Sequence, residues 1–277
     1  MNGGGGGGGV SPKNLTEDDK QFLNQAITSE SKSFGDLVGS WRQGPDGNCS
    51  TVACIKAAMD RYDNKVFDEV QRTENGYSIA MQDGYKMTMS DSELAAAKEA
   101  AKFRGPDGPG KSYATFLYGA AAKRNSLDNG MSLGQSFNDL NDGENIYSPA
   151  KLLGLYDQMV PVNAQTLDGQ DSVVAGSNRH AVFVNRNADG SHTTDRWGSA
   201  RPFNGTDALG NGLVNAYTFK PRNWNGSGTP QASPRSASSS SRSSSTRSGP
   251  SSARSGVRRP SATSQSRSAT TRTSSKK

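Results

Sequence analysis

The chain has 277 residues and a formal net charge of +6, but its excess of basic residues is confined to the C-terminal end. From Gly226 onward there are ten Lys or Arg and no Asp or Glu, which leaves 22 basic and 26 acidic residues before that point. No stretch approaches the roughly 18 consecutive apolar residues of a membrane-spanning helix, and the N-terminus lacks the charged and apolar regions of a secretory signal. A cytoplasmic location is therefore the default expectation, with signal-independent secretion as the alternative.

Composition divides the chain into three parts. Residues 225–277 are dominated by Ser with interspersed Arg, and such a segment buries too little apolar surface to offset the entropy of ordering it. We therefore expect a disordered basic tail there. Residues 1–14 include seven consecutive glycines and are expected to form a flexible leader. The remaining residues, 15–224, are long enough for one domain with a substantial core.

The first predicted elements are two helices. Residues 17–29 follow Thr16, a residue type that caps helix N-termini, and they carry a modest apolar stripe. A loop rich in Gly and Pro then leads to Asn48, which we expect to cap a helix over 49–62. Cys49 would be the first residue of that second helix.

A β-hairpin is predicted next. Apolar residues alternate with polar or small residues over 77–81 and again over 85–89. Asp83 and Gly84 lie between these runs and suit a two-residue turn. This part of the chain should therefore form two paired antiparallel strands.

Ser90 and Glu93 have the spacing of a capping box, in which each side chain accepts a hydrogen bond from the backbone of the other residue. Helices are expected over three ranges: 91–103, 112–123 and 149–158. Strands are expected later, over 181–184, 193–197 and 213–219, with a turn at 185–190. Because helices come early and strands late, the sequence favours an α+β fold over a doubly wound sheet.

Cys49 is the candidate nucleophile. A thiol reacts as thiolate, and both a helix N-terminus and a nearby imidazolium lower its pKa. Cys49 would have the first of these at the start of its helix, and His180, which opens an apolar strand, is the best source of the second. Cys54, the other cysteine, lies on a different face of the same helix, so we expect no disulfide between them and a core position for Cys54.

The third member of the predicted site is Asp195. If residues whose numbers sum to 375 face each other in a hairpin, His180 lies directly opposite Asp195. Opposed side chains on one face are close enough for a hydrogen bond, through which the carboxylate would orient the imidazole. The alternatives are that Asp195 caps a turn or pairs with Arg179, and that His192 takes the place of His180.

Short motifs surround these residues. Gln43 begins a Gln-Gly pair six residues before Cys49, His180 begins a His-Ala pair, and Asp195 begins an Asp-Arg-Trp-Gly run that ends at Gly198. In this order the motifs resemble the papain-like superfamily of cysteine proteases, and its calpain branch in particular. In that superfamily an oxyanion-hole glutamine stands six residues before the nucleophile, and a His-Ala strand and an Asn-x-Trp-Gly segment follow.

The resemblance implies an α+β papain-like fold, in which the helix that carries the cysteine packs on an antiparallel sheet. It implies that Cys49 attacks an amide or thioester carbonyl, that His180 transfers the proton, and that Gln43 with the Cys49 N–H stabilises the oxyanion. Asp195 stands where papain and calpain have Asn, and Ser50 stands where papain has Trp. The resemblance therefore does not carry over a substrate preference.

The predicted function is that of a cysteine endopeptidase-like hydrolase that cleaves a peptide or isopeptide bond in a protein or peptide substrate. Acyl transfer of the transglutaminase type, or glutamine deamidation, by the same residues is the first alternative, since only the acceptor differs. The second alternative is a non-catalytic interaction protein, such as a delivered bacterial effector, on a degenerate protease scaffold.

Two further features have plainer interpretations. A calcium loop is suggested by four polar residues, Asp139, Asn141, Asp142 and Glu144, but Gly143 occupies a ligand position, so an ordinary polar loop is the better interpretation. We expect no cofactor and no metal site. The basic tail suits an anionic partner, nucleic acid or membrane, and such binding would be non-specific because the tail holds no aromatic residue for base stacking. A soluble flexible tail without a partner is the alternative, and the many Ser beside Arg also suit a phosphorylated segment or a delivery tail.

Overall fold

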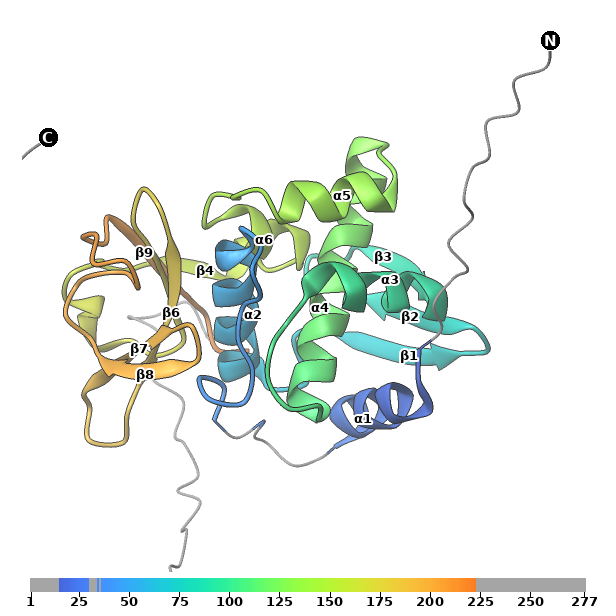
Figure 1. Cartoon of the computed structure of the whole chain (residues 1–277), viewed down its shortest axis with the longest axis horizontal. Helices are drawn as coiled ribbons and strands as arrows, with labels where there is room; N and C mark the ends of the chain where they lie inside the picture. Colours follow the sequence, from blue (N-terminus) through green and yellow to red (C-terminus); the bar gives the residue numbers. More distant parts are fainter. Residues whose placement is uncertain (1–14, 30–33, 35, 223–277) are drawn as a thin grey trace, which may run out of the picture. The chain divides into compact units, whose positions relative to one another are not determined.

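The computed structural model describes residues 15–29, 34 and 36–222, and the predicted leader and tail lie outside these residues (Figure 1). The helices are α1 (Glu17–Thr28), α2 (Cys49–Tyr62), α3 (Asp91–Ala101), α4 (Pro109–Asn129), α5 (Leu133–Leu140) and α6 (Ser148–Leu152), with short 3-10 turns η1 (Tyr156–Gln158) and η2 (Leu167–Gly169). In this part of the chain no helix is both long and apolar enough to cross a lipid bilayer.

The strands form two antiparallel sheets. They are β1 (Glu69–Thr73), β2 (Gly76–Ala80), β3 (Lys86–Ser90), β4 (Met159–Pro161), β5 (Val173–Gly176), β6 (Ala181–Arg186), β7 (His192–Arg196), β8 (Ser199–Pro202) and β9 (Asn215–Phe219). The smaller sheet has the order β1-β2-β3, and the larger one has the order β4-β9-β5-β6-β7-β8. Separate helices and antiparallel sheets confirm the α+β class that the sequence predicts.

Helix α2 lies between the larger sheet and the other helices (Figure 1). It contacts β5 and β6 on one side and α4 and α6 on the other. Nearly all of its residues are buried, and the small side chains of Ala53, Ala57 and Ala58 let the neighbouring backbones approach closely. The core therefore fixes α2 on every side, and with it the position of Cys49 at the start of the helix.

The caps read from the sequence are confirmed except at α2. The Ser90 hydroxyl accepts from the Glu93 N–H at 3.1 Å, and the Glu93 carboxylate accepts from the Ser90 N–H at 2.9 Å. Thr16 caps α1 in the same way. Asn48 precedes α2 as predicted, but its side chain makes no cap hydrogen bond; its amide nitrogen donates to the Asn141 side chain at 2.9 Å.

Several predicted element boundaries are wrong. The hairpin of β2 and β3 is present, but Ala80 pairs with Lys86, and the chain turns through a longer loop than the predicted two residues. Helix α4 extends beyond the predicted 112–123 at both ends. The helix predicted over 149–158 is broken in two, because Gly154 has a φ of +73°, which an α-helix cannot contain.

Helix α5 and strands β1, β4, β5 and β8 were not predicted. Strand β1 is the exposed edge of its sheet, and β4 and β8 are short, so none of the three has a long alternating pattern. Strand β5 is only four residues long and is buried along its whole length, so it is apolar on both faces and shows no alternation. Short or edge strands carry little periodicity for a sequence to reveal.

The predicted hairpin register of β6 and β7 is also wrong. Val184 pairs with Thr194 and Arg186 pairs with His192. A ladder continued in this register brings Phe183, and not His180, opposite Asp195. Strand β6 extends to Arg186, two residues into the predicted turn, and the chain then reverses between Asn187 and Ser191 before β7.

Candidate active site

Cys49 is the first residue of α2, and the loop before it is held by backbone contacts. The Gly47 N–H donates to the Asn141 carbonyl oxygen at 2.9 Å, and the Ser50 hydroxyl donates to the Glu144 carbonyl oxygen at 2.6 Å. A Cβ atom on Gly47 would lie 2.8 Å from that Asn141 oxygen, so only glycine permits this approach. The segment around 141–144 therefore fixes the start of the helix.

The environment of Cys49 favours its thiolate. Burial by itself raises the pKa of this thiol, but interactions with the His180 side chain and the Ala181 backbone outweigh that effect, so the pKa lies below its ordinary value. Cys54 has no such neighbours. It is fully buried, and burial raises the pKa of its thiol to about 12, which agrees with the predicted core position.

His180 lies directly before β6, at the end of a compact turn. The Ser177 hydroxyl accepts from the His180 N–H at 3.0 Å and donates to the Asp207 carboxylate at 2.6 Å. Asp207 also accepts from Asn211 and Leu209, so the turn is anchored to a buried carboxylate. This support keeps the His180 backbone, and hence its ring, close to Cys49.

Trp197 covers the ring of His180, with 5.3 Å between the two ring centroids. It lies with Gly198 between β7 and β8, and both residues have positive φ values, as a two-residue hairpin turn requires. A positive φ of +51° is uncommon for a bulky side chain and costs about 1–3 kcal/mol. The strained turn therefore holds an aromatic ring against the histidine.

The four residues predicted from the sequence line one small cavity of about 20 Å³. Its remaining walls come from α2, from β6 and from the turn after β7: Val52, Ala53, Ala181, Val182, Phe183 and Trp197. The structure thus brings together Gln43, Cys49, His180 and Asp195, although more than 150 residues separate the first from the last.

Two of these four side chains make contacts other than those predicted. The Gln43 amide donates to the Asp46 carbonyl oxygen at 2.6 Å, within its own loop. One oxygen of the Asp195 carboxylate accepts from Lys56 at 2.6 Å, and the other accepts from the Gly198 N–H at 2.6 Å. The alternative that Asp195 caps a turn is therefore confirmed, and its ionic partner is Lys56 rather than Arg179.

The sequence pattern does not identify Lys56 as a residue of the site. This lysine is fully buried, and its ammonium group also donates to the Trp41 carbonyl oxygen at 2.8 Å and lies 4.7 Å from the centroid of the Trp41 ring. The available signal was a lysine seven residues after Cys49, which places it on the same helix face among apolar neighbours. Its carboxylate partner could not be deduced from that position.

A wider cleft of about 320 Å³ opens on the other side of Cys49. It is lined by Ser50, by residues 143–147, by residues 176–181 and by Asn215. Glu144 and Arg179 bring opposite charges to its walls. Burial, together with the nearby carboxylates Asp139 and Asp142, raises the pKa of the Glu144 carboxyl group.

In the described part of the chain, three carboxylates beside this cleft lie close enough together to hold a metal ion. Asp139, Asp142 and Glu144 each offer an oxygen, and these oxygens lie within 4.8 Å of one another. Asn141, the fourth residue of the suggested calcium loop, instead bonds through its side chain to Asn48. Because exposed acidic groups of this kind are common without an ion, we assign no metal to them.

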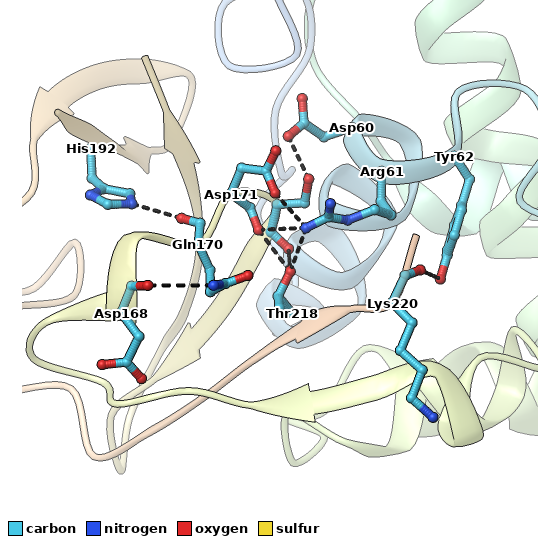
Figure 2. Close-up of polar contacts among 10 residues, drawn as sticks. Asp60, Arg61, Tyr62, Asp168, Gln170, Asp171, His192, Thr218 and Lys220 are labelled. Atoms are coloured by element: carbon cyan, nitrogen blue, oxygen red, sulfur yellow. Dashed lines mark hydrogen bonds and ion pairs between the residues drawn. The ribbon is translucent and has the colours of Figure 1, made fainter. Parts of the chain in front are cut away.

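His192 belongs to a separate polar cluster at the other end of α2 (Figure 2). Its Nε2 atom lies 2.7 Å from the Gln170 carbonyl oxygen. In the same cluster the Arg61 guanidinium forms an ion pair with Asp171 and donates to the Thr218 hydroxyl at 2.9 Å. His192 therefore does not line the cavity that contains Cys49.

Comparison of the chain with protein-family models, curated proteins and solved structures gives no match. The papain-like resemblance is therefore carried by the motifs alone, and the site geometry must support any function by itself.

Proposed function

We propose that the protein is a papain-like thiol hydrolase that cleaves a peptide or isopeptide bond, with Cys49 as the nucleophile and His180 as general acid and base. The observation that carries the proposal is the shared cavity of these two residues, in which the neighbouring histidine outweighs burial and lowers the pKa of the Cys49 thiol. A buried structural cysteine has the opposite shift, as Cys54 does.

In the first half of the proposed reaction the Cys49 thiolate attacks the carbonyl carbon, and a C–S bond forms. The Cys49 N–H at the helix start stabilises the oxyanion, and the Gln43 amide joins it after releasing the Asp46 carbonyl oxygen. The His180 imidazolium gives its proton to the leaving nitrogen as the C–N bond breaks. The product of this half-reaction is a thioester on Cys49.

In the second half water attacks the thioester. His180, now neutral, takes a proton from the water as the new C–O bond forms, and the C–S bond then breaks to release the acid. The imidazolium and the thiolate are both regenerated. The Trp197 ring over His180 supports this cycle by limiting the access of bulk water to the imidazole.

The wider cleft beside Cys49 supports a peptide as the substrate class. Its volume of about 320 Å³ lies within the range of ligand-binding sites. Asn178 and Asn215 place side-chain amides around it, and such groups can bind the N–H and C=O groups of an extended chain. Cys49 and His180 line this cleft as well as the smaller cavity, so a bound peptide would lie against both.

Alkylation of the two cysteines tests the proposal. At neutral pH iodoacetamide should modify Cys49 at least about tenfold faster than Cys54, because only Cys49 has a lowered pKa. Peptide mass spectrometry of timed samples measures both rates, and Cys54→Ala is the control that should leave the fast reaction intact. Slow and equal labelling of both thiols would overturn the proposal in favour of a non-catalytic interaction protein.

The type of reaction is tested with Cys49→Ala as the matched inactive variant. Proteomic comparison of peptide termini after incubation with each form should reveal termini that only the wild-type protein generates. Addition of a primary amine in the same assay distinguishes the acyl-transfer alternative, since a transferase would attach the amine to glutamine side chains without producing new termini.

A further inference from the structure

Lys56 is a buried charge in a place where an apolar side chain would fit. It lies in the middle of α2, is fully buried, and has Ile55 and Ala57 as equally buried neighbours. Moving an ammonium ion out of water costs several kcal/mol, and a pair with a buried carboxylate recovers that cost only with good geometry. The lysine therefore adds little net stability over methionine or leucine, and any effect it has on chemistry must come through the groups around its carboxylate partner.

The lysine reaches the candidate active site through its partner. Val52 and Ala53 line the Cys49 cavity, and Lys56 follows them one turn further along the same face of α2. Its ammonium group lies 2.6 Å from Asp195, which itself lines the cavity with His180. The pair therefore lies at the wall of the cavity that contains the cysteine and the histidine.

We propose that Lys56 is a positioning residue for the Cys49–His180 pair: it holds the Asp195 carboxylate in place and cancels its negative charge beside the thiolate. The inference rests on the proposed thiol chemistry. Asp195 by itself would favour the imidazolium but oppose the thiolate, since a like charge in a medium of low dielectric constant repels it. With Lys56 paired, the Asp195 carboxylate is held in place and its charge is offset.

Other charges around the pair do not replace this function. Asp36, from the segment before α2, acts on Lys56 in the same direction as Asp195 and so adds negative charge. Arg42 packs its side-chain carbons against Gly198, next to the turn that Asp195 caps. Arg179 and Glu144 line the wider cleft and carry opposite charges. Lys56 is the cation that the structure places on the carboxylate itself.

The expected effect of Lys56→Met follows from charge alone. Loss of a positive charge makes the cavity more negative, and a more negative environment raises the pKa of every group within it. The pH midpoint at which Cys49 becomes reactive should therefore rise, by about one pH unit for a single charge at this range. Asp195→Asn added to Lys56→Met removes the uncompensated charge and should return the midpoint close to that of the wild-type protein.

The experiment measures the rate of iodoacetamide reaction at Cys49 against pH, in the Cys54→Ala background and without any substrate. Arg61→Met is the matched control, because it breaks the other buried ion pair of α2 and should leave the midpoint unchanged. Circular dichroism shows whether each variant is folded. If Lys56→Met does not fold, Lys56→Gln, which is neutral but can still donate to Asp195, should give the same upward shift.

An unchanged midpoint in folded Lys56→Met or Lys56→Gln would overturn the inference and leave Lys56 as a structural residue only. A midpoint that stays raised in the Lys56→Met, Asp195→Asn double variant would also overturn it, because the shift would then not come from the Asp195 charge. Failure of the proposed function looks different. In that case the wild-type Cys49 itself would react with the midpoint of an ordinary thiol.

Discussion

Two buried cations on α2 make the same kind of interaction with different surroundings. In the middle of the helix Lys56 pairs with Asp195 of β7, and near its end Arg61 pairs with Asp171, which precedes β5. Both cations are fully buried at the side chain, and both pairs join the helix to the larger sheet. Buried ion pairs of this kind contribute little net stability but are costly to break.

The difference lies in what each pair faces. The Arg61 guanidinium also donates to the Asp171 carbonyl oxygen and to the Thr218 hydroxyl, and neither of these residues lines the Cys49 cavity (Figure 2). The Lys56 pair includes a carboxylate that lines a cavity with a cysteine and a histidine. A buried ion pair is therefore no mark of function by itself, and the neighbouring reactive groups decide whether it can affect chemistry.

Arg61→Met should have the largest effect on stability. Removal of the guanidinium leaves Asp171 as an uncompensated buried charge, which costs about 3–5 kcal/mol. Urea unfolding measures this loss, and the pH midpoint of Cys49 alkylation should stay at its wild-type value. A shift in the midpoint as large as that of Lys56→Met would show that the two ion pairs do not differ in their effect on Cys49.

His180→Ala should have the next largest effect, and on reactivity rather than stability. Loss of the imidazole removes the interaction that outweighs burial, so the pKa of Cys49 should rise and alkylation at pH 6 should slow by about 10²-fold. His192→Ala is the matched control at the other end of α2, where the ring contacts the Gln170 carbonyl oxygen and Phe203. Equal slowing in both variants would argue against His180 as the partner of Cys49.

Trp197→Gly should have the smallest effect on folding. Glycine adopts the positive φ at this position without strain, so the stability should change by no more than about 1 kcal/mol despite the loss of a large side chain. The exposed imidazole should nevertheless weaken the activation of Cys49, seen as a higher alkylation midpoint. A large loss of stability would show instead that the ring, which is 44% exposed, is mainly a packing element.

How far the sequence predicts this molecule depends on the range of the interactions involved. The capping box at Ser90 and the thiol at the start of a helix are local patterns, and the structure confirms both positions. The facing of His180 and Asp195 required a hairpin register, and that prediction is wrong, because the length of the turn after β6 set a different one. Asp195 nevertheless lines the same cavity, where its carboxylate caps the turn between β7 and β8 by accepting from the Gly198 N–H.

By itself, then, the sequence determined the α+β class and the helix that begins at Cys49. Hydrogen bonds within a few residues and hydrophobic periodicity fix such features, and both can be read along the chain. Only the tertiary structure decided that Asp195 pairs with Lys56, 139 residues away. A buried charge pairs with whichever opposite charge the packed core brings beside it and shields from water. No local sequence pattern carries that information.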